Sequence, residues 1–171
     1  MNAELRKLKT FQELSRETNA FSAELWISLT GEDKQLAAYV ENDGGGGSHM
    51  IRWVDRSHGK SAFEDAFNAW TKAMPPVPCE DDWAIERGFG PLEMDADLWI
   101  GEEVERIAWE QQLKRRCSRN TLIRLEGDSA DEYRTFKPAV KFTPEMGVQL
   151  RAKHGAKLIE IINERFAKGA K

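Results

Sequence analysis

Apolar and polar residues alternate over three stretches in the first third of the chain, and this alternation predicts strands. Every second residue is apolar from Leu25 to Leu29 and again from Leu36 to Val40. Thr30–Asp33 between them has the composition of a turn, so the two stretches form a predicted hairpin. Ile51–Val54 is a third, shorter stretch of the same kind. We therefore expect a small antiparallel sheet here.

Helices are predicted on either side of these strands. Thr10–Glu13 and Ser61–Glu64 each match the capping box, in which a hydroxyl and a glutamate satisfy the first amides of a helix. Apolar residues at helical spacing follow both boxes, to Phe21 in the first helix and to Met74 in the second. Prolines at positions 75, 76 and 78 then end the second helix.

The second half of the chain predicts a further helical and hairpin section. Asp95 or Asp97 can cap a long helix that runs to about Arg116. Thr121–Leu125 and Glu132–Phe136 predict a hairpin, and Thr143 followed by proline begins a last helix that we expect to reach Phe166. Gly155 inside that helix would cost about 1 kcal/mol relative to alanine.

Together these elements predict an α+β fold. Residues 1–78 form an α-β-β-β-α unit, a small antiparallel sheet with covering helices. Residues 79–171 add a helix–β-hairpin–helix section with an acidic helical segment and a basic C-terminal helix. We expect the two sections to pack as one compact body.

The segment Gly44–Met50, with the sequence GGGGSHM, interrupts this pattern. Four glycines and a serine resemble a flexible engineered linker, and the His-Met that follows resembles the trace of a cloning site. The segment lies between two strand-like stretches that belong to one sheet. This position favours the replacement of a loop, or the rejoining of parts of one domain, over the fusion of two independent proteins.

Composition restricts the class of protein. No stretch of about 18 apolar residues is long enough to span a membrane, and the N-terminal residues lack the apolar core of a secretion signal. Cys79 and Cys117 lie far apart, and we expect two free thiols in a reducing cytoplasm. The expected localisation is therefore cytoplasmic.

Charge is distributed unevenly along the chain. The net charge of −4 is made up of −2 over residues 1–79, −9 over residues 80–110 and +7 over residues 111–171. Part of this polarity suits the long helix, because acids favour its first turns and bases its last turn. Such asymmetry between segments is also an indication of charged partners.

Motifs for chemistry are scarce. The three histidines (one of them His49, in the glycine-rich segment) and the two cysteines lack the paired spacings of a zinc site, and no nucleophile motif or phosphate-binding loop is present. We expect no metal, no cofactor and no enzymatic activity. A small enzyme whose site is assembled across the sheet stays the weakest of three hypotheses.

The leading hypothesis is a protein-interaction module that acts through an acidic, tryptophan-bearing surface. Carboxylates along helices can imitate a phosphate backbone, and aromatic residues among them can anchor a partner. The partner would be a protein, such as a DNA-binding protein, and the chain would be a regulator or inhibitor, as phages and other mobile elements encode. The alternative is a solvated acidic face whose tryptophans pack inward. The candidate residues are Glu80, Asp81, Asp82, Trp83, Trp99, Glu102, Glu103, Glu105 and Trp109.

The second hypothesis is a nucleic-acid-binding protein that uses the basic C-terminal third. Clustered cations are the usual footprint of binding to phosphates. The overall pI of about 5.5 opposes this interpretation, as does the position of the strongest cluster at the end of a helix. The candidate residues are Lys114, Arg115, Arg116, Arg119, Arg151, Lys153 and Lys157.

Overall fold

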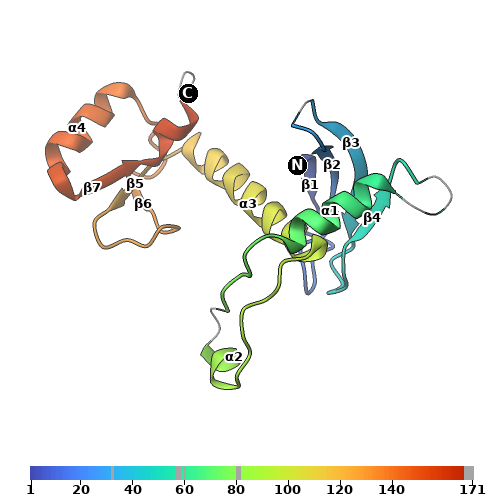
Figure 1. The fold of residues 1–171 in the computed structure, drawn as a ribbon. Coiled ribbons are helices and arrows are strands. Elements are labelled where there is room, and N and C mark those ends of the chain that lie inside the picture. The colour runs from blue at the N-terminus through green and yellow to red at the C-terminus, as the bar shows by residue number, and fades with distance from the viewer. Residues whose placement is uncertain (32, 57–58, 60, 80–81, 168–171) are drawn as a thin grey trace. The chain divides into compact units, whose positions relative to one another are not determined.

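The computed structural model describes residues 1–31, 33–56, 59, 61–79 and 82–167. The chain forms two compact units, Met1–Ala108 and Trp109–Lys171. Each unit has its own antiparallel sheet and contributes helices, so the predicted α+β fold is confirmed (Figure 1). The division predicted near residue 78 falls inside the first unit, and the packing of the two predicted sections stays a prediction. Among the described residues, no helix is long and apolar enough to cross a bilayer.

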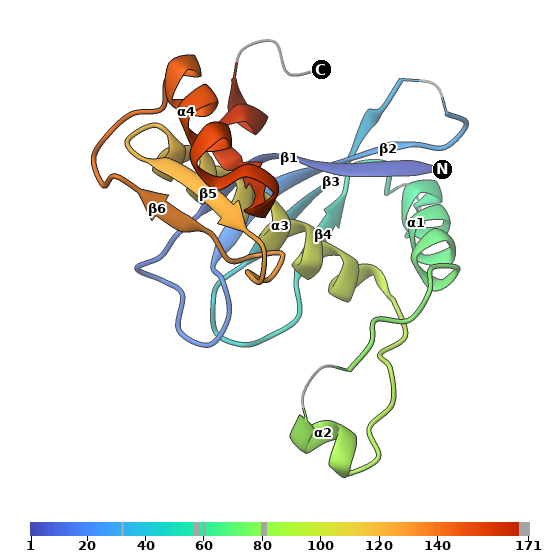
Figure 2. The ribbon, with the colours of Figure 1, turned by 90° about the vertical axis from the view of Figure 1, so that its left-hand side faces the viewer.

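Four strands form a meander in the first unit: β1 (Asn2–Thr10), β2 (Phe21–Ser28), β3 (Gln35–Asn42) and β4 (Met50–Trp53). Each pairs antiparallel with the next, in the order β1-β2-β3-β4 (Figure 2). The predicted hairpin is β2 with β3, and the predicted third strand is β4, so both are confirmed. Alternate residues of β2 are buried, which gives the sheet one apolar face.

Strand β1 was not predicted, because the spacing of its apolar residues does not resemble that of a strand. A bulge shifts the pairing of β1 with β2 between Arg6 and Lys9, and Lys7 inside it has a φ of 54°. Because of this shift, Leu5 and Leu8 both pack against the core although they are three residues apart. A spacing of three is typical of a helix, so the bulge conceals the strand from pattern analysis.

The N-terminal helix predicted from Thr10 is wrong. Thr10 is the last residue of β1, and Phe11 to Leu14 form a turn in which the Leu14 amide donates to the Phe11 carbonyl at 3.0 Å. Phe11 and Leu14 were expected on the buried stripe of that helix, but both are exposed. The segment predicted as this helix is instead the loop that connects β1 to β2, because Thr10 pairs with Phe21 at its two ends.

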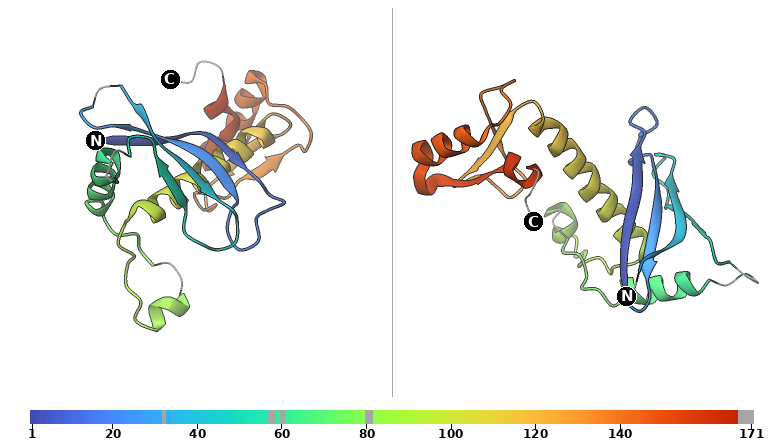
Figure 3. Two further views of the ribbon diagram at one scale, coloured as in Figure 1. Left: turned by 90° about the vertical axis from the view of Figure 1, so that its right-hand side faces the viewer. Right: turned by 90° about the horizontal axis from the view of Figure 1, so that it is seen from above.

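Helix α1 (Ala62–Lys72) begins where the second capping box predicted. The Ser61 hydroxyl accepts from the Glu64 amide at 3.0 Å, and the Asp55 carboxylate accepts from the Ala62 amide at 2.9 Å. Hydrogen bonds from Ser61 and from the first amides of the helix hold the pKa of Asp55 below its usual range. Both views in Figure 3 place α1 beside the start of β1. Its central residue Phe67 is fully buried in the core of the sheet.

Two further helices follow the prolines, α2 (Asp82–Glu86) and α3 (Ala96–Cys117), and both were predicted. Asp95 caps α3, because its carboxylate accepts from the Leu98 amide at 2.8 Å. The first turns of α3 bury Ile100 against the same core as Phe67. Helix α3 begins in the first unit and ends in the second.

The second unit contains a three-stranded antiparallel sheet in the order β6-β5-β7. Its strands are β5 (Thr121–Leu125), β6 (Arg134–Phe136) and β7 (Leu158–Ile161). The pairing of β5 with β6 confirms the predicted hairpin. Helix α4 (Pro144–His154) starts as predicted, with the Thr143 hydroxyl accepting from the third helical amide.

The last helix does not reach Phe166, so that part of the prediction is wrong. Helix α4 ends at His154, and Gly155 after it has a φ of 55°, a conformation that glycine adopts most readily. A 3-10 turn, Gly155–Lys157, leads into β7, which pairs with β5. A second 3-10 helix, Ile162–Phe166, follows. Gly155 was expected to destabilise a long helix, but it is the residue at which a shorter helix ends.

Asn163 connects three segments of the second unit. Its side chain is buried, with the oxygen accepting from the Leu122 amide at 2.8 Å. Its amide nitrogen donates to the Cys117 carbonyl at 3.0 Å and to the Asn120 carbonyl at 2.8 Å. One side chain thus ties the C-terminal 3-10 helix to the end of α3 and to the start of β5.

Candidate functional site

Several exposed apolar side chains of the first unit lie on the segment Val77–Leu92, which we call the protruding segment. Two backbone hydrogen bonds of 2.9 Å pair Val77 with Leu92 and close its base. Figures 1 and 2 show α2 at its far end, standing away from the sheet of the same unit. Three apolar side chains at or near this far end are between 50% and 60% exposed, and we call them the apolar tip: Trp83, Ile85 and Phe89. Leu92 at the base of the segment is 58% exposed as well.

Trp83 and Phe89 organise the apolar tip. Their rings stack with 6.3 Å between centroids and an angle of 10°. The Arg87 guanidinium lies 4.0 Å from the centroid of the Trp83 ring, a cation–π arrangement. Tryptophan and arginine are the residue types most enriched among those that dominate binding energy at protein interfaces. Exposed groups of this kind therefore resemble an anchor for a partner.

The predicted acidic site is divided among several places. Asp82 and Trp83 lie on the protruding segment, and Glu80 and Asp81 lie outside the described residues. Glu102 and Glu105 are exposed on α3. Glu103 on the same helix forms an ion pair with Arg106, with 2.7 Å between Oε1 and the nearest guanidinium nitrogen.

The other two tryptophans of the predicted site occupy different environments. Trp99 packs edge-on against Phe67 at 5.3 Å and against Trp70 at 5.6 Å between centroids, within the core of the first unit. It therefore contributes to the fold, as the solvated-face alternative expected. Trp109 belongs to the second unit and lies 5.8 Å from the Tyr133 ring.

The basic residues of the second hypothesis all lie in the second unit and are exposed. Arg116 donates to the Tyr133 hydroxyl at 3.0 Å, and Arg151 pairs with Glu164 at 2.6 Å. Lys153 lies over the Phe136 ring at 5.1 Å. Lys114 and Arg115 lie in the last turn of α3, and Arg119 follows two residues after its end. Lys157 lies in the 3-10 turn after α4.

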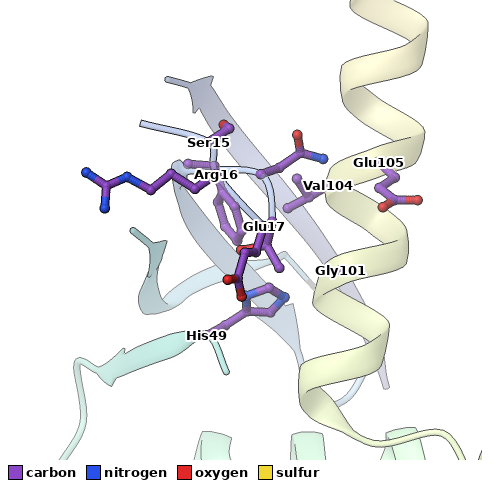
Figure 4. A pocket seen from close by; sticks show the side chains of 10 residues that line it. Ser15, Arg16, Glu17, His49, Gly101, Val104 and Glu105 are labelled. Atoms are coloured by element: carbon purple, nitrogen blue, oxygen red, sulfur yellow. The ribbon is translucent and has the colours of Figure 1, made fainter. Parts of the chain in front are cut away.

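The first unit also contains an open cavity of about 430 Å³ that pattern analysis did not indicate. One wall is the loop Ser15–Asn19, and the other is the face of α3 that carries Gly101, Val104 and Glu105. Figure 4 shows Glu17 and His49 on the loop side and Glu105 on the helix side, whereas the Arg16 side chain points away from α3.

His49 in this cavity is held in one tautomer. The Asn42 oxygen accepts from the Gly44 amide at 2.7 Å, so the other end of the Asn42 side chain is its NH₂ group. That NH₂ group lies 3.0 Å from His49 Nδ1, which must act as an acceptor. Burial lowers the pKa of His49, with the Asp97 carboxylate acting in the opposite direction. The imidazole is therefore neutral at pH 7, with its proton on Nε2.

The glycine-rich segment is packed against the first unit. Three successive backbone amides, those of Arg16, Glu17 and Thr18, donate to the Gly44 carbonyl at 3.0–3.3 Å. The His49 amide donates to the Asp97 carboxylate at 2.6 Å. An unconstrained linker has no need of such contacts, so we treat Gly44–His49 as a structural loop of this unit. The engineered origin of the segment stays an interpretation.

Substitution of Gly44 tests this packing. Gly44 has a φ of 85°, and a Cβ there would lie 2.5 Å from the Leu14 carbonyl oxygen. We expect Gly44→Ala to lower the free energy of unfolding by about 2 kcal/mol, because an alanine is strained at that φ and meets rigid backbone. Gly47→Ala is the matched control, since nothing lies within 4 Å of its Cβ. Equal urea midpoints for the two variants would contradict this role.

Cys79 and Cys117 are not joined in a disulfide, as predicted. Burial raises the pKa of the Cys117 thiol to about 11, so it is protonated and unreactive at neutral pH. Among the described residues, no group of three histidine, cysteine or acidic side chains is placed to hold a metal ion.

Comparison with protein-family models, with curated proteins and with solved structures found no match to this chain. The site must therefore be interpreted from its own residues. Sequence reasoning found Trp83, and it missed Ile85, Phe89 and Leu92. An aromatic residue between Gly88 and the sequence Gly-Pro was the available signal for Phe89, because a loop of that composition cannot bury it. His49 was missed because the whole segment was set aside as a linker.

Proposed function

We propose that this chain is a non-enzymatic protein-interaction module that inserts the apolar tip of the protruding segment into a partner protein. The observation that carries the proposal is the exposure of Trp83, Ile85, Phe89 and Leu92 together on one closed, projecting segment. Grouped apolar side chains of this size are costly to leave in water, and on soluble proteins they mark interaction sites. The stacked Trp83 and Phe89 rings supply a rigid contact area.

The partner's surface is basic around the pocket that receives the tip. Residues 80–110 carry a net charge of −9, and Asp82 and Glu86 lie on α2 beside Trp83. Such a charge attracts cationic proteins and speeds their association. A DNA-binding protein fits this description, and the module would then act as its regulator or inhibitor, in the manner of small proteins encoded by phages and mobile elements.

Capture with matched variants tests the proposal. The tagged chain is compared with a Trp83→Ser/Phe89→Ser variant and with a control, Val148→Ser, which alters an apolar residue that is 69% exposed in the second unit. We expect the same protein to be recovered by the unaltered chain and by the control, and to be lost with the tip variant. Recovery by all three chains would reject the proposed interface.

The second candidate function, binding to nucleic acid, is supported by the exposed cations of the second unit. It predicts binding of bare DNA or RNA with a steep dependence on salt, since released counterions drive such binding. Substitution of Arg115 and Arg119 by Gln would then weaken binding, and substitution of Trp83 would not. Filter binding at two salt concentrations separates this function from the first.

A further inference from the structure

The cavity beside α3 shares no residue with the protruding segment. We propose that this cavity binds a basic group, an amine or a guanidinium, that carries a neighbouring oxygen acceptor, as an arginine or a lysine does with its backbone carbonyl. The proposal does not depend on the proposed interface, and each can be right where the other is wrong.

The acceptor on the ligand would pair with His49. Its Nδ1 is occupied by Asn42, and its proton is on Nε2, which lies 3.5 Å from the position that a Cβ of Gly101 would take. Nε2 makes no hydrogen bond to another described residue and is not enclosed by protein atoms. A fixed N–H donor that faces a cavity is satisfied by an oxygen acceptor from a ligand or from water.

The basic group on the ligand is required by two carboxylates. Glu17 on the loop and Glu105 on α3 line opposite walls, and neither forms an ion pair with a described residue. The one cationic side chain of the lining, Arg16, points away from α3. His49 is neutral and does not repel a cation. The cavity therefore has a net negative charge and offers charge-assisted hydrogen bonds to nitrogen donors.

The apolar part of the cavity fits the stem of such a side chain. Phe21 and Val104 line it, and both are almost fully buried, so they are fixed in place and present a small apolar area to the cavity. Gly101 leaves the helix surface bare at the level of His49 Nε2. Long basic side chains bury their methylene stem on such surfaces while the charged end stays hydrogen-bonded. The volume of about 430 Å³ is in the range of small-ligand sites.

Two blocked amino acids test the proposal by NMR titration of the full chain, with the Gly101 amide as the reporter. Nα-acetyl-arginine methylamide is the probe, and the corresponding citrulline derivative is a neutral control of nearly the same shape. We expect the arginine probe to bind about tenfold more tightly, because its guanidinium is charged and the lining carries two carboxylates that can accept charge-assisted hydrogen bonds. Equal affinity for the two probes, or no saturation by the arginine probe at millimolar concentration, would overturn the proposal.

Glutamate-to-glutamine variants test whether the arginine probe binds in this cavity. Glu17→Gln and Glu105→Gln are each expected to weaken binding of the arginine probe about fivefold. Glu13→Gln and Glu102→Gln are the matched controls, since both residues are exposed neighbours outside the cavity lining. An equal loss in the controls would show a general charge effect and reject the site.

Comparison of the blocked probe with free L-arginine identifies the source of the basic group. The blocked probe binds more tightly if the source is a polypeptide, and free L-arginine binds more tightly if it is a small molecule.

Discussion

Replacement of Asn163 by Ala is expected to lower the free energy of unfolding of the second unit by about 3 kcal/mol. The buried Asn163 side chain makes three hydrogen bonds to backbone groups of Cys117, Asn120 and Leu122. Alanine would leave a buried amide and two carbonyl oxygens without these partners, and it would leave a cavity as well. Hydrogen exchange at the β5 amides, together with urea unfolding, measures the loss.

Asn163→Asp sharpens this test. The carboxylate keeps an acceptor for the Leu122 amide, but it places an oxygen against the Cys117 and Asn120 carbonyls. We expect this nearly isosteric variant to be at least as destabilised as Asn163→Ala at pH 7, because acceptors then face acceptors. A loss below about 1 kcal/mol for both variants would mean that the side chain does not hold these segments together.

The second large effect is expected at the apolar tip. Trp83→Ala and Phe89→Ala should each weaken binding of the purified partner by about 30-fold, a cost typical of dominant interface residues. Each variant removes one ring of the stacked pair and leaves the other without its support. Because both side chains are more than half exposed, the melting temperature should stay almost unchanged. Calorimetric titration gives the affinity, and a matching loss with Val148→Ala would contradict the assignment.

The sequence predicts those helices and strands whose alternation or capping residues agree with the way the strands pair. The alternation through Leu25 and Val40 predicted β2 and β3, and the hydroxyls of Ser61 and Thr143 predicted the starts of α1 and α4. Each of these signals acts within one turn or one strand. No distant residue is needed to interpret them.

The errors in the fold arise where distant pairing decides the structure. The bulge at Lys7 gave β1 a helix-like spacing, and pairing with β2 settled its conformation. Residues 158–161 have helical spacing in the sequence, and pairing with β5 after the turn at Gly155 makes them a strand. In both cases the local pattern fits two structures, and the sheet selects one.

The candidate sites show the same contrast. Trp83 stood out by residue type and charge context, but its stacking on Phe89 depends on the path of the protruding segment. The cavity combines Glu17, His49 and Glu105, which are distant in sequence and meet only because the glycine-rich loop packs against the loop before β2. Because the glycine-rich segment resembled a linker, His49 was not considered as a site residue.

The measurement that tests the central claim most directly is site-specific photo-crosslinking. A benzophenone amino acid replaces Phe89 in one chain and Val148, an exposed residue of the second unit, in another. Mass spectrometry then maps the crosslinked peptides in the isolated complex. We predict that position 89 crosslinks to one basic surface of the partner and that position 148 does not. Crosslinks from position 148 with none from position 89 would contradict binding through the protruding segment.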